Sequence, residues 1–262
     1  MLSIRDVSIT YGKNPKPTVE GVNFDMAQGE IVSIVGESGS GKSTVIRAVL
    51  GCLPGEGYVS SGDILFEGHS LLEYTEAEWL KLRGTDISMI FQDSGAMINP
   101  IRRIGAQYVE YIRTHEKMSK KQAWDRGVEM LEKMRLPNGD NIMKSYPFQL
   151  SGGMRQRVGI AMAMTFQPKL LLGDEPTSAL DVTTQAQIVR QMMELREQYN
   201  TSIIVVTHNL GVAAYMADKI VVMKDGRVVD MGTREEVLSN PNDEYTKQLL
   251  ESVPTMGGYR FV

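Results

Sequence analysis

The residues best suited to chemistry form a glycine-rich run near the N-terminus, residues 36–43, which ends in Lys42 and Ser43. Its glycines let the backbone curl until successive amide N–H groups point inward, and a helix that begins near Lys42 adds partial positive charge. Lys42 can reach the β- and γ-phosphates of a nucleotide, and the Ser43 hydroxyl can ligate Mg²⁺. We therefore expect this loop to bind a nucleoside triphosphate. The residues expected to contact it are Gly36, Glu37, Ser38, Gly39, Ser40, Gly41, Lys42, Ser43 and Thr44.

The segments on both sides of this loop match what a phosphate loop requires. Residues 30–35 are an apolar run that predicts a strand, and residues 44–50 favour a helix. A glycine-rich turn that matched the motif by accident would lack this strand and helix. The flanking elements therefore favour the nucleotide-binding interpretation.

A second group of reactive side chains follows an apolar run at residues 170–172, which predicts a buried strand. Asp174 and Glu175 then stand at the carboxyl end of that strand, where ligands bind in open parallel sheets. Asp174 can hold Mg²⁺, directly or through water, and Glu175 can accept a proton from the water that attacks the γ-phosphate. The alternative is an acidic pair that caps a helix before Pro176.

Residues 150–157 read Leu-Ser-Gly-Gly-Met-Arg-Gln-Arg. On this signature run the chain resembles the ATP-binding-cassette (ABC) family, and the resemblance extends over nearly the whole chain. It implies an α/β fold with a P-loop NTPase core of RecA-like type, an antiparallel β subdomain and an inserted α-helical subdomain. Ser151, Gly152 and Gly153 open a helix whose N-terminus is a second anion site, although Ser-Gly-Gly alone is an ordinary helix cap. Because family members pack head to tail, the resemblance implies that this second site serves ATP bound by a partner.

The resemblance also assigns roles to single residues elsewhere. Tyr11 resembles the aromatic that stacks on adenine, although a lone tyrosine can equally pack on a sheet. Gln92 resembles the glutamine that senses Mg²⁺ and the attacking water, and Asp181 belongs to a loop that touches the partner. His208, after a predicted strand, resembles the histidine that contacts the γ-phosphate. The implied cofactors are ATP and Mg²⁺.

The resemblance implies that some of these residues take part in catalysis and others bind Mg²⁺. The expected catalytic residues are Glu175, His208 and Gln92, and the expected Mg²⁺ ligands are Ser43, Gln92 and Asp174. The other two histidines, His69 and His115, have no comparable context, and we expect them to be solvated.

Finer resemblance points to one branch of the family. Residues 91–100, 179–187 and 245–250 resemble the ATPases of dipeptide, oligopeptide and nickel importers. Asp243-Glu244 replaces the His-Pro that usually precedes the Tyr-Thr pair in this branch, and we expect no cluster-binding tail. The substrate stays open between small peptides and nickel or metal chelates.

The resemblance divides the chain into three parts. Residues 1–92 and 160–235 form the RecA-like core with the β subdomain, residues 93–159 form the helical subdomain, and residues 236–262 form a C-terminal helix and tail. The implied partners are a second ATPase subunit, either a paralogue or an identical copy, two transmembrane permease subunits and an extracytoplasmic solute-binding protein. Residues 94–103 are expected to carry motion to a permease. We expect a peripheral position on the cytoplasmic face of the membrane.

Periodicity and turn residues predict the remaining elements. The expected strands lie within residues 2–35 and at 86–91 and 202–206, with short segments between 57 and 68. The expected helices span 104–136, 182–199 and 233–250. We also expect a hairpin over residues 218–232, with its turn at Asp225-Gly226, and a loose tail in the last dozen residues.

Composition excludes several classes of protein. The chain has 262 residues, of which 42% are hydrophobic and 23% charged, an ordinary globular balance. The net charge is only −4 and the basic residues are dispersed, so we expect no nucleic-acid partner. Cys52 is the sole cysteine, which excludes an internal disulfide, and we expect it to be buried. The alternative to an importer ATPase is a non-transport ABC ATPase of DNA repair or translation. An ABC protein of DNA repair would normally insert a long coiled coil between the two nucleotide motifs, whereas only 131 residues separate Lys42 and Asp174, and a translation-associated one would carry two cassettes.

Overall fold

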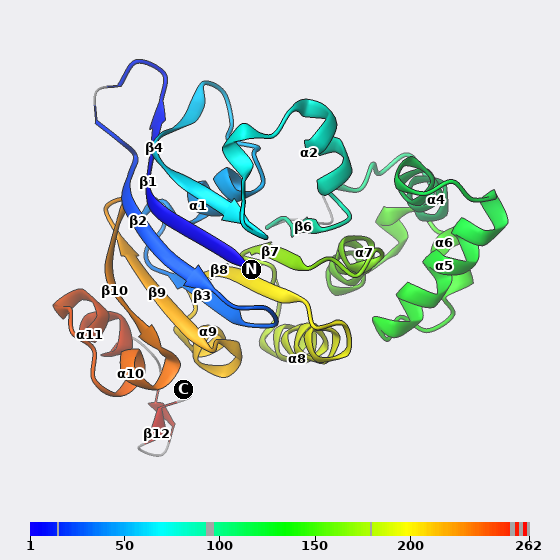
Figure 1. The fold of residues 1–262 in the computed structure, drawn as a ribbon. Helices are drawn as coiled ribbons and strands as arrows, with labels where there is room; N and C mark the ends of the chain where they lie inside the picture. Colours follow the sequence, from blue (N-terminus) through cyan, green and yellow to red (C-terminus); the bar gives the residue numbers. More distant parts are fainter. Residues whose placement is uncertain (15, 93–96, 179, 252–254, 257–258, 261–262) are drawn as a thin grey trace. The chain divides into compact units, whose positions relative to one another are not determined.

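The computed structural model describes residues 1–14, 16–92, 97–178, 180–251, 255–256 and 259–260 (Figure 1). The chain divides into two compact units, residues 1–79 with 202–262 and residues 80–201. These units divide the chain by packing, whereas the three predicted parts divide it by family role, so the predicted boundaries stay a prediction.

The first unit contains an antiparallel sheet in the order β2-β1-β4-β5. Its strands are β1 (Leu2–Tyr11), β2 (Val19–Met26), β4 (Gly57–Phe66) and β5 (His69–Ser70). In β2, Val22, Phe24 and Met26 are buried and alternate with exposed residues, as the period-two pattern predicts. The expectation of short segments between residues 57 and 68 is wrong, because residues 57–66 form one strand along β1, although the pairing shifts register and Gly62 within it has a φ of +82°.

The same unit contains four further strands in the order β10-β9-β3-β8. They are β3 (Ile31–Val35), β8 (Ser202–Thr207), β9 (Lys219–Lys224) and β10 (Arg227–Thr233). β3 lies between β8 and β9 and is parallel to both, and every residue of β3 and β8 is buried. β10 returns antiparallel to β9 across the predicted turn at Asp225-Gly226, which confirms the hairpin.

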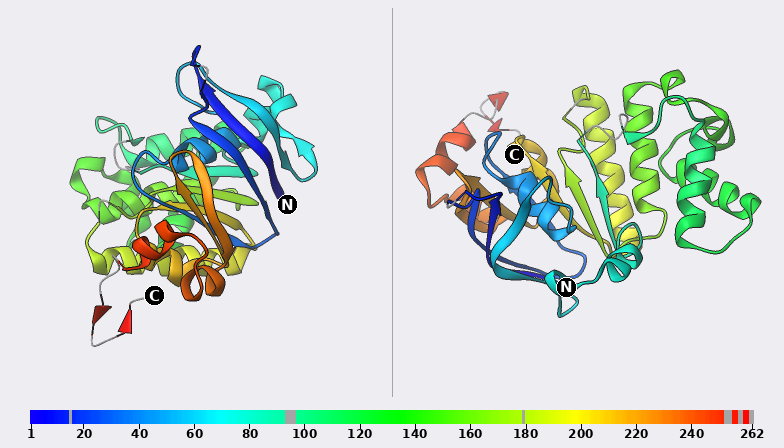
Figure 2. Two further views of the ribbon diagram at one scale, coloured as in Figure 1. Left: turned by 90° about the vertical axis from the view of Figure 1, so that its left-hand side faces the viewer. Right: turned by 90° about the horizontal axis from the view of Figure 1, so that it is seen from above.

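The helices of this unit are α1 (Lys42–Val49), α9 (Leu210–Met216), α10 (Arg234–Ser239) and α11 (Glu244–Glu251). Residues from β3, β9, α9, α10 and α11 share one hydrophobic core, which includes Val35, Leu210, Val222, Tyr245 and Leu250. Figure 2 shows the strands of this unit together with the helices that follow them in sequence. The single helix predicted over residues 233–250 is wrong, since the chain breaks after Ser239 where Pro241 cannot continue a helix.

The second unit carries two parallel strands, β6 (Ile87–Ile90) and β7 (Leu170–Asp174), in which every residue is buried. Its helices are α4 (Ile104–His115), α5 (Lys120–Lys133), α6 (Gly139–Lys144), α7 (Gly152–Met164) and α8 (Val182–Tyr199), and α2 (Glu76–Leu82) precedes them. Helices α4, α5 and α6 contact one another and form the helical group visible in Figures 1 and 2. Among the described residues, no helix combines the length and the apolar character that crossing a membrane would need.

Three smaller expectations are wrong. His115 is half-buried between the rings of Tyr111 and Phe166, and burial lowers its pKa below the ordinary value. Cys52 is partly exposed rather than buried. Two short paired strands, β11 (Thr255–Met256) and β12 (Tyr259–Arg260), lie where a loose tail was expected. His69 is exposed, as predicted.

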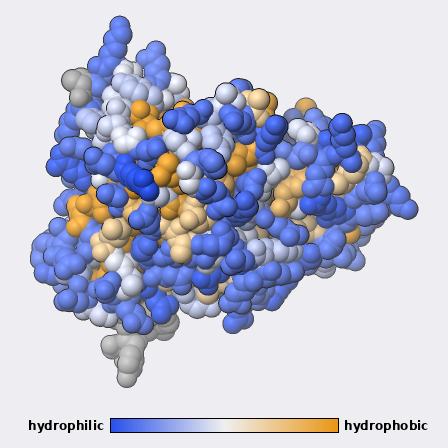
Figure 3. Space-filling view, in the orientation of Figure 1, coloured by the Kyte–Doolittle hydropathy of each residue, from blue (hydrophilic) through white to orange (hydrophobic). Residues whose placement is uncertain are grey.

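On the face shown in Figure 3, hydrophilic residues cover most of the surface of each unit and apolar residues form small scattered groups. Apolar residues scattered in this way are normal on protein surfaces.

Candidate nucleotide site

The glycines of the phosphate loop, residues 36–43, occupy backbone conformations that other residues rarely adopt. The φ angles of Gly36, Gly39 and Gly41 are +149°, +86° and +98°. A Cβ atom on Gly36 would lie 2.1 Å from the backbone oxygen of Met223, and one on Gly41 would lie 2.7 Å from Cγ2 of Val19. Two of these positions therefore need glycine for space as well as for conformation, because the loop presses against the end of β9 and the start of β2.

Lys42 closes the loop and begins α1. It is 4% exposed, and its Nζ donates hydrogen bonds to the backbone oxygens of Gly36 (2.8 Å) and Glu37 (2.6 Å). The turn between β9 and β10 supports the loop from the other side, since the Gly226 N–H donates to the oxygen of Ser40 at 3.2 Å. The loop is thus fixed at its base, and its tip at residues 37–39 is exposed. This arrangement fits a phosphate ligand held by backbone N–H groups and by a cation.

His208 leaves the sheet at the same edge as this loop. β3 and β8 are adjacent and parallel, and Val35 is paired with Thr207. The next residues along the two strands are Gly36 and the exposed His208. The structure therefore brings these two predicted site positions together at the carboxyl ends of β3 and β8.

Tyr11 ends β1 in the same unit and is partly exposed. Its ring fills the space beside Gly57, where a Cβ atom would lie 2.5 Å from Cε1 of the tyrosine. Both uses predicted for Tyr11, adenine stacking and sheet packing, stay predictions.

In the second unit, two of the predicted catalytic side chains contact each other. Asp174 ends β7 and is 3% exposed, and Glu175 follows it. Nε2 of Gln92 donates a hydrogen bond to Oε2 of Glu175 at 3.1 Å. The glutamine predicted to sense the attacking water therefore holds the carboxylate predicted to act as the base.

Glu175 has a φ of +47°, a left-handed conformation that costs a non-glycine residue about 1–3 kcal/mol. Neighbouring hydrogen bonds stabilise this turn. Gln156 of α7 donates through Nε2 to the oxygen of Pro176 at 2.5 Å, and the Ser178 N–H donates to the oxygen of Glu175 at 3.2 Å. The surrounding structure thus holds this strained turn in place, and the catalytic role of Glu175 stays a prediction.

The signature loop, residues 151–153, begins α7. The Ser151 Oγ accepts a hydrogen bond from the Met154 N–H at 3.3 Å, so the hydroxyl acts as a helix cap. A Cβ atom on Gly152 would meet nothing within 4 Å, whereas one on Gly153 would lie 2.8 Å from Cγ2 of Thr184.

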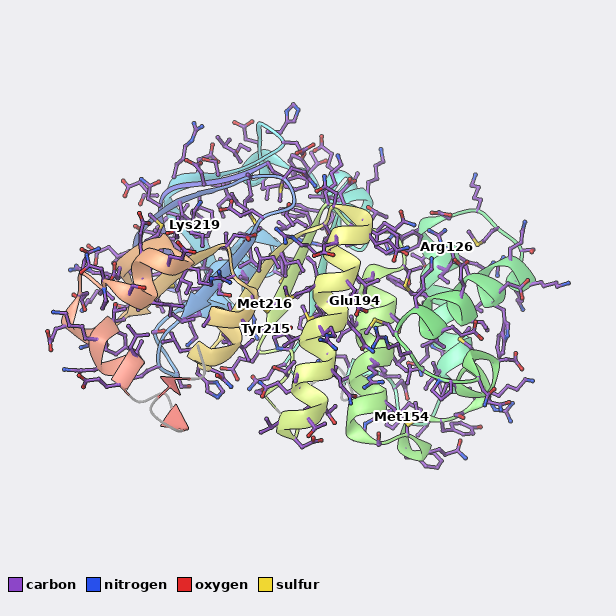
Figure 4. The ribbon with its side chains drawn as sticks, turned by 90° about the horizontal axis from the view of Figure 1, so that it is seen from below. Arg126, Met154, Glu194, Tyr215, Met216 and Lys219 are labelled. Atoms are coloured by element: carbon purple, nitrogen blue, oxygen red, sulfur yellow. The ribbon has the colours of Figure 1, made fainter. Side chains whose placement is uncertain are left out.

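Thr184 connects this loop to Asp181, the N-cap of α8. Its N–H and its hydroxyl donate to the Asp181 carboxylate at 3.0 and 2.7 Å, and these bonds lower the pKa of Asp181. Farther along α7, Arg157 donates to Oε1 of Gln187 on α8 at 2.6 Å, and Figure 4 shows the two helices side by side, with Met154 and Glu194 labelled on them. The predicted partner-facing residues Ser151, Gly152, Gly153 and Asp181 thus lie on two packed helix starts.

The expected Mg²⁺ ligands do not all lie in one unit. Ser43 belongs to the first unit, and Gln92 and Asp174 belong to the second. The ion site therefore stays a prediction.

Two contacts of these loops could not be predicted. The Glu37 N–H donates to the hydroxyl of Tyr245 at 2.9 Å, although 208 positions separate the two residues. Gln156 belongs to the signature run, and nothing in that run indicates its contact with the turn after Glu175. Neither partner is near its target in sequence, so no local pattern signals these contacts.

Comparison with known proteins gives consistent results. Residues 19–178 match the family model described as ABC transporter. The chain is 46% identical to the oligopeptide transport ATP-binding protein OppD of Bacillus subtilis, over 98% of this chain and 72% of that protein. It is 45% identical to the dipeptide transport ATP-binding protein DppD of Lactococcus lactis, over 94% of this chain and 71% of that protein.

A solved structure has the same fold. The dimeric, post-hydrolysis ATP-binding cassette MJ0796 bound to ADP and Pi superposes with a TM-score of 0.78 at 29% identity, over 89% of this chain and 99% of that chain. It supports the predicted α/β fold of an ABC cassette with a P-loop. The phosphate loop, the signature run and these likenesses lead to one conclusion: the chain belongs to the ABC transporter family and is an ATP-hydrolysing cassette of that family.

Proposed function

We propose that this chain hydrolyses MgATP to power the import of small peptides through partner membrane subunits. The observation that carries the substrate class is its likeness, over nearly the whole chain, to proteins named for oligopeptide and dipeptide transport. These names favour peptides over the nickel or metal-chelate alternative. The relatives reported above give no support to a role in DNA repair or translation.

The roles proposed for the phosphate loop follow from its geometry. The exposed tip and the amides up to Thr44 receive the phosphates, and Lys42 exchanges backbone oxygens for phosphate oxygens. Mg²⁺ prefers one or two protein oxygens together with phosphate oxygens, for which Ser43 and Asp174 are the proposed ligands. When bound, the ion would neutralise charge that develops on the phosphates.

The proposed catalytic step uses the turn after β7. Glu175 accepts a proton from the attacking water, and Gln92, which already donates to the Glu175 carboxylate, orients the carboxylate and the water. Gln92 would also be among the residues that hold Mg²⁺. His208, which follows the carboxyl end of β8, contacts the γ-phosphate. Tyr11 stacks on the adenine ring. The nucleotide or the surface of a second ATPase subunit, packed head to tail, is contacted by Ser151, Gly152, Gly153 and Asp181.

Exposed apolar side chains in the second unit support a membrane partner. Ile101 is 82% exposed and Phe148 is 71% exposed, and the Phe148 ring stacks on Tyr146 with centroids 5.4 Å apart. The stacked Tyr146 and Phe148 rings form one contiguous aromatic surface, and contiguous apolar surfaces are the kind that protein partners cover. We propose that they receive a cytoplasmic segment of a permease, with a solute-binding protein on the other side of the membrane. The chain would then sit peripherally on the cytoplasmic face.

The variant Glu175→Gln tests the proposed function. We expect ATP binding to persist, hydrolysis to fall about 100- to 10,000-fold, and uptake of labelled di- and oligopeptides to stop in cells that carry only this variant. Glu194→Gln is the matched control, because Glu194 is a half-exposed residue of α8 that pairs with Arg135. Full turnover by Glu175→Gln would remove Glu175 from the base role. If cells that carry only Glu175→Gln still took up peptides but lost nickel uptake, the transported substrate would be nickel rather than peptides.

A further inference from the structure

We propose that Tyr245, on the C-terminal helix α11, is a positioning residue for the phosphate loop: its hydroxyl holds the peptide group between Gly36 and Glu37 in the orientation that nucleotide binding needs. The inference rests on the proposed nucleotide role of this loop. It adds a residue from the far end of the chain, beyond the region that the family model matches.

Two side chains hold this peptide group at its two ends. The Glu37 N–H donates to the Tyr245 hydroxyl at 2.9 Å, and Nζ of Lys42 donates to the Gly36 oxygen at 2.8 Å. The N–H and the C=O of a trans peptide point in opposite directions, so the two bonds together oppose rotation of the peptide plane. Bonds at both ends of one peptide also polarise and strengthen each other.

Tyr245 is itself firmly placed. It is 5% exposed and belongs to the core that contains Val35 and Val222. Nζ of Lys224 lies 4.7 Å from the centroid of its ring, a distance typical of a cation–π contact. The Tyr245 N–H donates to the Asp243 carboxylate at 2.8 Å, at the start of α11. The burial of the ring in this core and the hydrogen bond at its backbone N–H give the hydroxyl a defined position.

The phosphate loop needs such support at this point. Gly36 cannot shift toward β9, because even a Cβ atom there would lie 2.1 Å from the Met223 oxygen, whereas Glu37 and the two residues after it are exposed. Without the tyrosine hydroxyl, the exposed side of the peptide is free to turn and to carry the acceptor of Lys42 with it. Apparent affinity then falls in proportion to the fraction of molecules whose loop is competent to bind.

The test is Tyr245→Phe in the full chain, which keeps the ring and removes only the hydroxyl. We expect the Kd and KM for ATP to rise about three- to tenfold, in line with the loss of one hydrogen bond, while kcat in the assembled transporter changes less than about twofold. Without nucleotide, hydrogen exchange of the Glu37 amide should accelerate, and exchange of the β3 amides should stay as in the wild type.

Two controls separate positioning from general weakening of the fold. Leu250→Ala removes a side chain that is 3% exposed from the same helix and core, so it should lower Tm but leave the Kd for ATP unchanged below the transition. Tyr215→Phe removes the hydroxyl of a 54% exposed tyrosine on α9, labelled in Figure 4, and should change neither quantity.

The outcomes are distinct. Unchanged Glu37 exchange in Tyr245→Phe, or a Kd shift of the same size in Leu250→Ala, would overturn the proposal. Lys42→Ala separately tests the nucleotide role of the loop: ATP binding that survives in Lys42→Ala would contradict the proposed function, whereas the exchange measurement on Glu37 needs no nucleotide.

Discussion

The phosphate loop leads into α1 and the signature loop forms the start of α7, and both contain glycines, but these glycines meet different structural needs. In the phosphate loop, Gly36 and Gly41 have positive φ angles, and added Cβ atoms would overlap with neighbouring elements. In the signature loop, neither glycine has a positive φ, and only Gly153 has a close neighbour. Gly152 faces open space.

This difference shows how complete each loop is within one chain. The phosphate loop is supported by β2, by the turn between β9 and β10, and by Tyr245. The signature loop presents an exposed Ser151 and an uncovered Gly152 at the start of α7. An uncovered surface at a helix N-terminus supports the proposal that a second subunit, carrying its own nucleotide, completes it.

The comparison predicts its largest effect for Gly36→Ala. The added methyl group would overlap with the Met223 oxygen, so we expect ATP binding to be lost and the free energy of unfolding to fall by about 2 kcal/mol or more. Denaturant titration and nucleotide titration measure both effects. Gly152→Ala is the matched control, and its unfolding free energy should stay within about 0.5 kcal/mol of the wild type. Normal ATP binding by Gly36→Ala would show that the loop tolerates a shifted backbone.

Ser151→Arg should lower hydrolysis only in the assembly. Ser151 is exposed, and its hydroxyl bonds to Met154 at the start of α7 rather than to the phosphate loop. The isolated chain should therefore bind ATP with unchanged affinity. In the assembled transporter, a bulky cation at this position should prevent closure on the partner's nucleotide and lower hydrolysis at least about tenfold, equal to about 1.4 kcal/mol. Steady-state ATPase assays on both forms measure this. Unchanged turnover in the complex would refute the shared site.

Gly153→Ala tests whether the two signature glycines differ. We expect a loss of about 2 kcal/mol in unfolding free energy, because the new methyl group would lie 2.8 Å from Cγ2 of Thr184. Thr184→Ser removes that carbon and keeps the hydroxyl that donates to Asp181. The double variant should therefore recover most of the loss, and a double-mutant cycle measures the coupling. Strictly additive effects would mean that Thr184 is not the obstacle.

The local parts of the site were predictable because their signals are contiguous in sequence. A phosphate loop needs glycine at fixed positions between a strand and a helix, and the structure has β3 before the loop and α1 after it. Asp174 ends a buried strand as predicted, and α8 spans Val182–Tyr199 as predicted. Backbone geometry over a few residues decides all of these features.

The supporting contacts were not predictable because packing decides them. Tyr245 reaches Glu37 across 208 positions, and Gln156 reaches Pro176 from another element. The sequence around Tyr245 resembled one family branch without indicating what the hydroxyl contacts. The break between α10 and α11 had a local signal in Pro241, which the helical periodicity of the region outweighed in the prediction.

The smallest predicted effect concerns the support behind the phosphate loop, at Asp230. This carboxylate is 6% exposed and accepts hydrogen bonds from the N–H groups of Asn242 (2.9 Å) and Asp243 (3.3 Å), just before α11. Burial raises the pKa of Asp230, but these bonds outweigh burial, and the pKa lies below its ordinary value. The charged form therefore stabilises the fold fully above the ordinary aspartate range, about pH 4, and this contribution is lost as pH falls through the lowered pKa.

Asp230→Asn should consequently cost about 1 kcal/mol at neutral pH, and the difference from the wild type should shrink on acidification below about pH 4. Denaturant titrations between pH 3 and pH 7 measure it, with the exposed Asp125→Asn as the control that should run parallel to the wild type. A constant difference at every pH would exclude the Asp230 charge as the source. If Asp230→Asn also accelerates exchange of the Glu37 amide, the support of the phosphate loop extends from Tyr245 through α11 to β10, because Asp230 fixes the start of the helix that carries the tyrosine.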